Sequence, residues 1–135
     1  SPLEERVKTY IEEKKLTKYI KLLGSRNDTV ELYQGMDAFF LPSFFEGLPV
    51  TGVEAQAMGL SMVVSDTVTR EMVYTDLVDY VSLNDTPEAW ASRLEIALRK
   101  NAKREQYADR LKLSNFSNIG CGNRLEQVYC WWING

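Results

Sequence analysis

The chain contains no histidine, and this absence narrows the chemistry that its residues can perform. Without an imidazole, none of the 135 residues can act as a histidine general base, so carboxylates are the remaining acid–base groups. The sequence also shows no cluster of metal-ligating residues. We therefore expect neither a metal ion nor another cofactor, and we look for function among the acidic side chains.

Cysteine is scarce, because only Cys121 and Cys130 are present. If both lie on one final helix, a separation of nine residues places them on opposite faces, where a disulfide between them is not expected. They are typical of reduced thiols, and we predict a cytoplasmic protein.

A basic excess and long apolar runs are also lacking. The net charge of −3 argues against a nucleic-acid partner, since no surplus of cations exists to neutralise phosphates. The longest apolar runs are far too short to span a bilayer. With 44% hydrophobic and 26% charged residues, the chain has the composition of one ordinary globular domain with a real core.

The segment 37–66 has the clearest pattern in the chain. An apolar run over Ala38–Leu41 ends at a proline, and a second apolar run reaches Asp66. Between them lies a helical pattern over Val50–Met58, which Pro49 opens and Gly59 closes. Strand, loop, helix and strand in this order predict a parallel βαβ unit.

The start of the predicted helix has the features of an anion site. The amides of residues 47–50 would point out of its N-terminus, at the edge of the sheet where ligands bind in parallel folds. Two carboxylates flank this corner, Glu46 in the loop and Glu54 in the helix. At 100° per residue, Glu54 falls on the apolar stripe, away from the polar side that we assign to Thr51 and Gln56. An isolated glutamate there would reach water or pair with a lysine, but two acids around a helix start favour a ligand site.

Residues 46–55, Glu-Gly-Leu-Pro-Val-Thr-Gly-Val-Glu-Ala, resemble the E-x7-E motif of retaining glycosyltransferases of the GT-B fold, family four. Leu41-Pro42-Ser43 before it and residues 57–64 after it also match the usual pattern of that family. Within the family, the chain is most similar to bacterial enzymes of capsular polysaccharide and exopolysaccharide synthesis. The similarity is strongest over residues 16–66.

The resemblance implies an α/β fold, with a doubly wound, Rossmann-like parallel sheet in the order 3-2-1-4-5-6. Residues 1–135 would then form a single partial nucleotide-sugar-binding domain that lacks its first two strands and the N-terminal acceptor domain. Four strands are expected here, including Tyr19–Leu23 and Asp79–Leu83. The absent strands would leave a gap two strands wide, which the fragment either closes directly or fills by self-association with another copy.

The resemblance also assigns roles to the motif. Glu46 would contact hydroxyls of the donor sugar as the catalytic candidate, and Glu54 would hold the ribose hydroxyls. The amides of Gly47 and Leu48 are the candidates for further donor contacts, whereas Pro49 has no N–H and can only shape the turn.

Two other segments correspond to donor-contacting regions of the family. The turn Ser25-Arg26-Asn27 would line the nucleotide base, although a solvated turn explains Arg26 equally well. The family often places two glycines and a glutamate near residues 67–71. Here the glycines are absent, and Glu71 matches that position only loosely.

Capping residues predict the remaining helix starts. Ser1 and Pro2 open a helix with one apolar face, and Asp28 with Glu31 forms a capping box for the next helix. Thr86-Pro87 opens a third, for which we expect four buried residues: Trp90, Leu94, Ala97 and Leu98.

The C-terminal third predicts two more helices. The basic run Lys100–Arg104 is expected to offset the dipole at the end of the helix before it. A helix over Gln106–Leu113 follows, and then a final helix with an apolar face at Leu125, Val128, Tyr129 and Trp132. Tyr129, Trp131 and Trp132 either contact the absent domain or, for Trp132, pack in the local core.

These features favour the donor-binding part of a retaining glycosyltransferase that moves a sugar from a nucleotide-sugar. The resemblance implies a UDP-sugar, and a glycan or lipid-linked acceptor, which would place the enzyme in the cytoplasm or at the inner face of the membrane. The fragment alone is expected to be inactive, because it lacks the acceptor site. Two alternatives remain at this point, a non-catalytic nucleotide- or carbohydrate-binding module and a flavodoxin-like interaction module.

Overall fold

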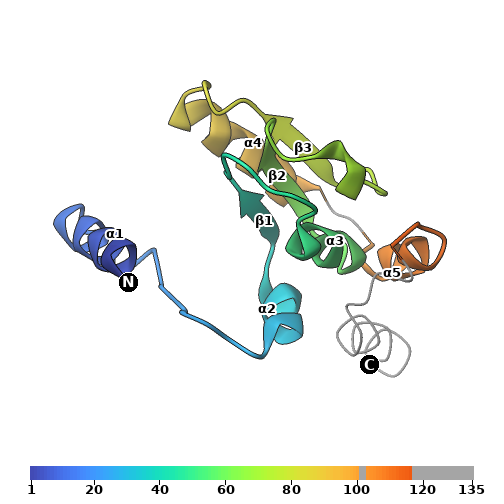
Figure 1. Ribbon diagram of the computed structural model, residues 1–135, viewed down its shortest axis with the longest axis horizontal. Helices are drawn as coiled ribbons and strands as arrows, with labels where there is room; N and C mark the ends of the chain where they lie inside the picture. The colour runs from blue at the N-terminus through green and yellow to red at the C-terminus, as the bar shows by residue number, and fades with distance from the viewer. Residues whose placement is uncertain (101–102, 117–135) are drawn as a thin grey trace.

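The structure is a computed structural model that describes residues 1–100 and 103–116, and it confirms the α/β class (Figure 1). A parallel sheet in the order β1-β2-β3 forms its centre. The strands are β1 (Ala38–Leu41), β2 (Ser61–Ser65) and β3 (Val78–Val81). The helices are α1 (Pro2–Glu13), α2 (Thr29–Gly35), α3 (Val50–Ala57), the 3-10 turn η1 (Arg70–Met72), α4 (Pro87–Arg99) and α5 (Glu105–Lys112).

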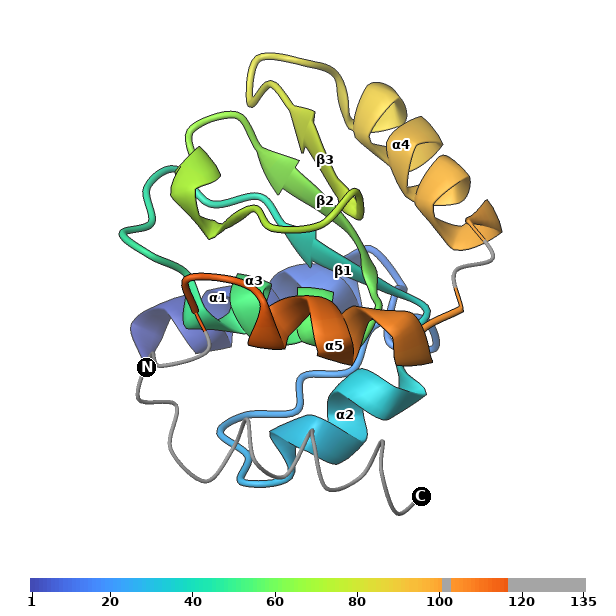
Figure 2. The same ribbon diagram turned by 90° about the vertical axis from the view of Figure 1, so that its right-hand side faces the viewer.

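Helices cover both faces of the sheet, as expected for a doubly wound fold. Helix α4 packs on one face, and α3 with α5 beside it lies on the other (Figure 2). Every residue of β2 is buried. Because successive side chains of a strand point to opposite faces, Met62 and Val64 pack in the core under α3, whereas Val63 packs with Trp90 of α4.

The predicted βαβ unit is confirmed as β1, α3 and β2. Helix α3 ends where predicted, since Gly59 has a positive φ of 69°. A β-carbon at Gly59 would also lie only 2.6 Å from the Cα atom of Arg104. Glycine is therefore required there for two reasons, the left-handed backbone and the close approach of a distant segment.

The predicted strand over Tyr19–Leu23 is wrong, and the sheet has three strands among the described residues rather than four. The segment has no ladder partner, and its large side chains remain exposed, with Tyr19 75% and Leu23 50% accessible. A strand forms only where a neighbour accepts its backbone hydrogen bonds. Within the described residues this segment therefore adds no strand to the sheet, and pairing with a second copy stays a prediction.

Two of the three predicted caps are confirmed. The Ser1 hydroxyl accepts from the Glu4 amide at 3.3 Å, and the Thr86 hydroxyl accepts from the Ala89 amide at 3.2 Å. The capping box of Asp28 and Glu31 is wrong, although Asp28 does occupy the N-cap position of α2. Arg26 binds the Asp28 carboxylate through Nε at 2.6 Å and through a second nitrogen, so that carboxylate does not cap the helix.

Two predicted faces need correction. In α4, Trp90 and Ala97 are buried and Leu94 is partly buried, but Leu98 is 56% exposed because it lies 100° around the helix from Ala97. In α3, Gln56 is fully buried instead of lying on a polar side.

The buried Gln56 amide is satisfied by hydrogen bonds, which explains its position. Its Nε2 donates to the carbonyl of Met72 at 2.9 Å, and its Oε1 accepts from the Thr75 hydroxyl at 2.9 Å and the Tyr74 amide at 3.2 Å. The side chain thus fastens the segment after β2 to α3. Periodicity alone could not find this, because the polarity of glutamine predicts exposure.

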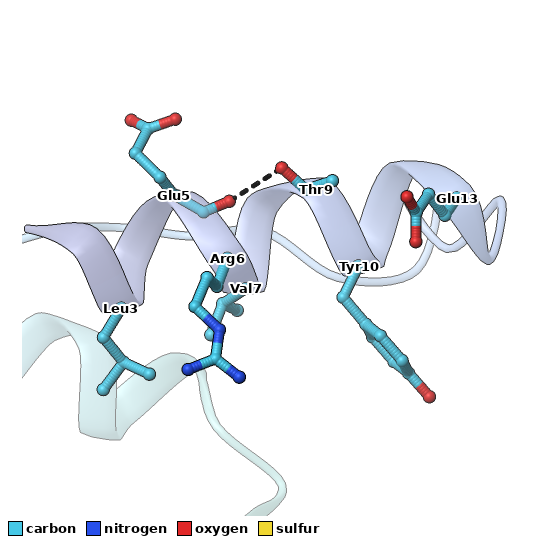
Figure 3. A pocket seen from close by; sticks show the side chains of 7 residues that line it. All are labelled: Leu3, Glu5, Arg6, Val7, Thr9, Tyr10 and Glu13. Atoms are coloured by element: carbon cyan, nitrogen blue, oxygen red, sulfur yellow. Dashed lines mark hydrogen bonds between the residues drawn. The ribbon is translucent and has the colours of Figure 1, made fainter.

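Helix α1 stands apart from the sheet, and the segment 14–28 connects it to α2 (Figure 1). Its predicted apolar side chains do lie on one side, where Leu3, Val7 and Tyr10 project together (Figure 3). They line an open groove of about 520 Å³ and remain 66%, 40% and 58% exposed, while Ile11 is buried. None of the described helices is long and apolar enough to cross a membrane.

The predicted final helix, with Leu125, Val128, Tyr129, Trp131 and Trp132, lies outside the described residues, as do Cys121 and Cys130. The helix predicted over Gln106–Leu113 is confirmed as α5.

Asp76 holds α5 against the body of the protein. Its Oδ1 accepts from Arg110 at 2.9 Å and from the Tyr107 hydroxyl at 3.2 Å. Desolvation alone would raise the pKa of Asp76, but a backbone hydrogen bond and the contacts from Tyr107 and Arg110 outweigh it and lower the pKa below 3.8. The folded carboxyl therefore binds protons less readily than the unfolded one.

We expect the Asp76 contribution to stability to be present above the unfolded pKa of 3.8 and to be lost as the pH falls through the lower folded pKa. Urea midpoints of wild type and Asp76→Asn should differ at about pH 7 and converge at about pH 2. Asp85→Asn, a change at an exposed acid, is the control. A wild-type advantage over Asp76→Asn that grows on acidification would contradict the assignment.

Candidate functional site

The loop over residues 42–49 leaves the carboxyl end of β1 and leads into α3 (Figure 2). Glu46 is partly buried in this loop, and its Oε1 accepts a hydrogen bond from the Ser43 hydroxyl at 2.8 Å. The carbonyl of Ser43 in turn accepts from the hydroxyls of Thr67, at 2.8 Å, and Ser65. Glu46 is thus fixed to the carboxyl ends of β1 and β2 through Ser43.

The sequence alone does not indicate this group of hydroxyls. Ser43 belongs to the family pattern, but nothing local identifies Ser65 and Thr67 as its partners. The available signal was a hydroxyl residue at the carboxyl end of each of two neighbouring parallel strands, because those ends meet at one edge of the sheet.

The N-terminus of α3 lies where the sequence predicts it. Pro49 is the N-cap, and Val50 is the first helical residue. The amides of Gly47 and Leu48 donate to no carbonyl or side chain within the described part of the chain. Both residues are exposed, and a β-carbon at Gly47 would meet nothing within 4 Å. The corner therefore presents unused donors beside open space, which suits an anionic ligand.

Glu54 is buried, as its place on the apolar stripe predicts, with only 3% of its surface exposed. The Tyr33 hydroxyl donates to its Oε2 at 3.0 Å and also lies 3.5 Å from the carbonyl of Thr51. The carboxylate therefore lies beside the first turn of α3. Its Oε1 is buried and has no hydrogen-bond partner among the described residues. A buried acceptor left in this state costs free energy, and a group that donates a hydrogen bond to it would remove that cost.

Arg104 joins the ends of the two helices that carry Tyr33 and Glu54. At the end of α3, its Nε donates to the carbonyl of Met58 at 2.8 Å. At the end of α2, its other nitrogens donate to the carbonyls of Tyr33, Gln34 and Met36 at 2.7, 3.4 and 3.1 Å. The expectation that residues 100–104 only offset the dipole of α4 is therefore wrong for Arg104, which serves two other helix ends.

The arginine is partly desolvated in this position. Desolvation lowers the pKa of Arg104, and the nearby charge of Asp37 opposes that effect. No carboxylate forms an ion pair with Arg104 in the part of the chain that the structure describes. Helix carbonyls carry partial negative charge, so they take the role that a counter-ion would have.

The other predicted contacts are more distant from this corner. Ser25, Arg26 and Asn27 are exposed in the segment that leads into α2, at the opposite end of β1 from the loop with Glu46 (Figure 1). Arg26 is occupied by its ion pair with Asp28, and Glu71 is exposed in η1. Contact of Ser25–Asn27 with a nucleotide therefore stays a prediction.

The two acids have separate supports, Ser43 for Glu46 and Tyr33 for Glu54. Each support is a hydroxyl that donates to one oxygen of the carboxylate. Both acids flank the same loop and helix start, as the motif predicts. Their convergence on one ligand is a prediction that rests on the resemblance.

Three curated relatives are similar to parts of this chain. "Putative glycosyltransferase EpsF" of Bacillus subtilis (strain 168) is 31% identical over 107 residues, which is 78% of this chain and 28% of that protein. "UDP-Gal:alpha-D-GlcNAc-diphosphoundecaprenol alpha-1,3-galactosyltransferase" of Escherichia coli is 45% identical over 51 residues, which is 38% of this chain and 13% of that protein.

The third relative shows the highest local identity of these three. "N,N'-diacetylbacillosaminyl-diphospho-undecaprenol alpha-1,3-N-acetylgalactosaminyltransferase" of Campylobacter jejuni is 53% identical over 47 residues, which is 35% of this chain and 12% of that protein. The chain thus spans less than a third of the length of each relative. No solved structure matches it.

The family described as "Glycosyl transferases group 1" matches residues 1–113, which include the whole sheet, the loop with Glu46 and helix α3. This match favours a glycosyltransferase over a flavodoxin-like interaction module. It confirms the resemblance that the motif at residues 46–55 indicates, and the chain belongs to the group 1 glycosyltransferase family.

Proposed function

We propose that this chain binds the nucleotide-sugar donor of a retaining glycosyltransferase that extends a lipid-linked glycan. A UDP-sugar is the proposed donor, in keeping with the name of the Escherichia coli relative. The names of two relatives describe acceptors linked to undecaprenol through a diphosphate, which supports a lipid-linked acceptor. Such an acceptor would bring the enzyme to the inner face of a membrane.

The proposed chemistry depends on the negative charge that develops as the bond between the donor sugar and its nucleoside diphosphate breaks. When the bond to the sugar opens, a nucleoside diphosphate leaves and its phosphate oxygens gain negative charge. The free amides of Gly47 and Leu48 and the N-terminus of α3 can stabilise that charge without rearrangement.

The two acids would hold the sugar and the nucleoside on either side of this charge. Glu46, fixed by Ser43, would accept hydrogen bonds from hydroxyls of the donor sugar and orient its anomeric carbon. Glu54 would accept hydrogen bonds from the ribose hydroxyls, with Oε1 as the unfilled acceptor.

The observation that supports this proposal most directly is the unpartnered Oε1 of Glu54. A carboxylate that served only to hold Tyr33 would gain nothing from a second, buried and unsatisfied oxygen. A ligand hydroxyl that donates to Oε1 would remove that cost, and the free energy regained would add to the affinity for the ligand.

Glu54→Ala is expected to weaken donor binding with a smaller change in turnover, because it removes a binding contact rather than a contact to the reacting sugar. In the complete natural protein that contains these residues, calorimetric titration with UDP, GDP and their sugar conjugates should show roughly a tenfold loss of affinity. Thr51→Ala, an exposed change on the same helix, is the matched control.

Unchanged affinity in Glu54→Ala would remove the assignment of the ribose contact. A wild-type protein that binds a nucleotide but transfers no sugar to any lipid-linked acceptor would favour a non-catalytic binding module instead. A protein that binds none of the nucleotides would contradict the proposed function as a whole.

A further inference from the structure

Tyr33 engages one oxygen of Glu54 and leaves the other without a hydrogen-bond partner among the described residues. Its hydroxyl is 3.0 Å from Oε2, and the hydrogen bond between them is buried. With Oε2 engaged, Oε1 is the oxygen left without a partner in the described structure. A carboxylate held by one oxygen cannot rotate freely, so the direction of its remaining lone pairs is set by Tyr33.

Burial and two contacts fix the position of Tyr33 itself. Only 5% of its surface is exposed, and its ring centroid lies 6.1 Å from that of Phe39 on β1. Its carbonyl accepts from Arg104 at 2.7 Å, and the same guanidinium binds the carbonyl of Met58 at the end of α3. The tyrosine and the glutamate therefore belong to two helices whose ends are joined by one side chain.

This arrangement favours a ligand group with particular chemistry. The carboxylate oxygen Oε1 is an acceptor, so it selects hydroxyl or N–H donors and rejects groups that carry only acceptors, such as phosphate. A site that is built to bind a hydroxyl discriminates strongly against an analogue without it, because the buried acceptor is then left unpaired.

We propose that Tyr33 is a positioning residue that aims Glu54 Oε1 at the ribose hydroxyls of the donor and thereby makes the site selective for ribonucleotides. This inference rests on the proposed function, since it concerns how the same donor is recognised. Tyr33 does not contact the donor in this arrangement and acts through Glu54.

A matched pair of tyrosine variants tests this role in the complete natural protein. Tyr33→Phe removes one hydroxyl that binds the Glu54 side chain. Tyr74→Phe removes one hydroxyl that donates to the carbonyl of Val53 at 2.9 Å. Val53 is the residue before Glu54 on α3. Both changes delete one phenol hydroxyl that bonds to α3, but Tyr33→Phe leaves a carboxylate rather than a carbonyl without its donor. The comparison of two ligands therefore separates a lost ribose contact from a general loss of stability.

The expected readout is affinity for UDP and for 2′,3′-dideoxy-UDP, which lacks both ribose hydroxyls. Tyr33→Phe should bind UDP roughly tenfold more weakly than wild type, while its affinity for the dideoxy analogue should stay within about twofold. Tyr74→Phe should stay within about twofold of wild type for both ligands. The effect should raise KM for the donor and leave kcat nearly unchanged.

Two further variants distinguish a role of Tyr33 in positioning Glu54 from a general loss of stability. Incorporation of 4-aminophenylalanine at position 33 restores a donor and should recover most of the UDP affinity. In a Glu54→Ala background, Tyr33→Phe should have no additional effect, since the partner of the hydroxyl is already absent. The Glu54→Ala protein has no carboxylate that Tyr33→Phe could leave unpaired. The double variant therefore provides the test if the single Tyr33→Phe variant folds poorly.

Equal losses for UDP and the dideoxy analogue, or equal losses in Tyr33→Phe and Tyr74→Phe, would overturn the inference while leaving the proposed function in place. A further loss of UDP affinity from Tyr33→Phe in the Glu54→Ala background would overturn it as well. Failure of the wild-type protein to bind either UDP or GDP would instead contradict the proposed function.

Discussion

Glu46→Gln is expected to lower turnover by roughly a hundredfold, while donor affinity changes much less. Glutamine keeps the size of the side chain but replaces one acceptor oxygen with an amide nitrogen and removes the charge. If Glu46 orients the donor sugar for reaction, the substitution disturbs the geometry of the reacting sugar and lowers kcat. The contacts that bind the nucleotide are unchanged, so donor affinity is kept. Steady-state kinetics with a UDP-sugar and a lipid-linked acceptor, together with calorimetry for UDP, measure both quantities.

Two variants make this test specific. Asp85→Asn removes an exposed negative charge that follows β3, at the same edge of the sheet, and should leave turnover unchanged. Ser43→Ala removes the hydroxyl that holds Glu46 Oε1 and should lower turnover in the same direction as Glu46→Gln but less steeply. A Glu46→Gln enzyme with normal kcat and weakened UDP binding would exchange the roles assigned to the two acids.

Arg104→Met is expected to lower the free energy of unfolding by about 3–5 kcal/mol, because four backbone carbonyls lose a charged donor. Methionine fills part of the space but donates no hydrogen bond. Carbonyls at the ends of α2 and α3 would lose their donors, among them those of Tyr33 and Met58. Part of this surface is exposed, so water would satisfy some of these carbonyls and limit the loss.

Urea unfolding followed by tryptophan fluorescence measures the change. Arg99→Met is the control, since the Arg99 side chain is 82% exposed and its guanidinium lies 3.9 Å from an exposed carboxylate of Glu95. That variant should differ from wild type by less than about 0.5 kcal/mol. Arg104→Lys keeps the charge but loses the planar guanidinium. We expect its free energy of unfolding to lie between those of wild type and Arg104→Met. An Arg104→Met protein as stable as Arg99→Met would show that the arginine does not hold the helices together.

The central unit could be predicted from the sequence because its signals are local. Apolar runs, a proline before the helix and Gly59 after it define β1, α3 and β2 without reference to distant residues. The motif at Glu46 and Glu54 is local as well, and the burial of Glu54 follows from its place on the apolar stripe.

The predictions from the sequence are wrong mainly where the structure of a residue depends on contacts with residues far along the chain. The segment Tyr19–Leu23 has the alternation of a strand, yet it stays unpaired because no neighbouring strand is present among the described residues. Gln56 is polar but buried, since the loop after β2 supplies its partners. The failed cap at Asp28 has a local cause instead, because Arg26, only two positions away, engages its carboxylate.

The sequence by itself determined the α/β class, the βαβ unit and the family, because each depends on residue type and spacing over short distances. Only the tertiary structure decided what supports the two acids. Ser43, Tyr33 and Arg104 reach their partners across 3 to 71 positions, mostly between separate elements. Hydrogen bonds form between atoms that folding brings within about 3 Å, and no spacing in the sequence encodes that proximity.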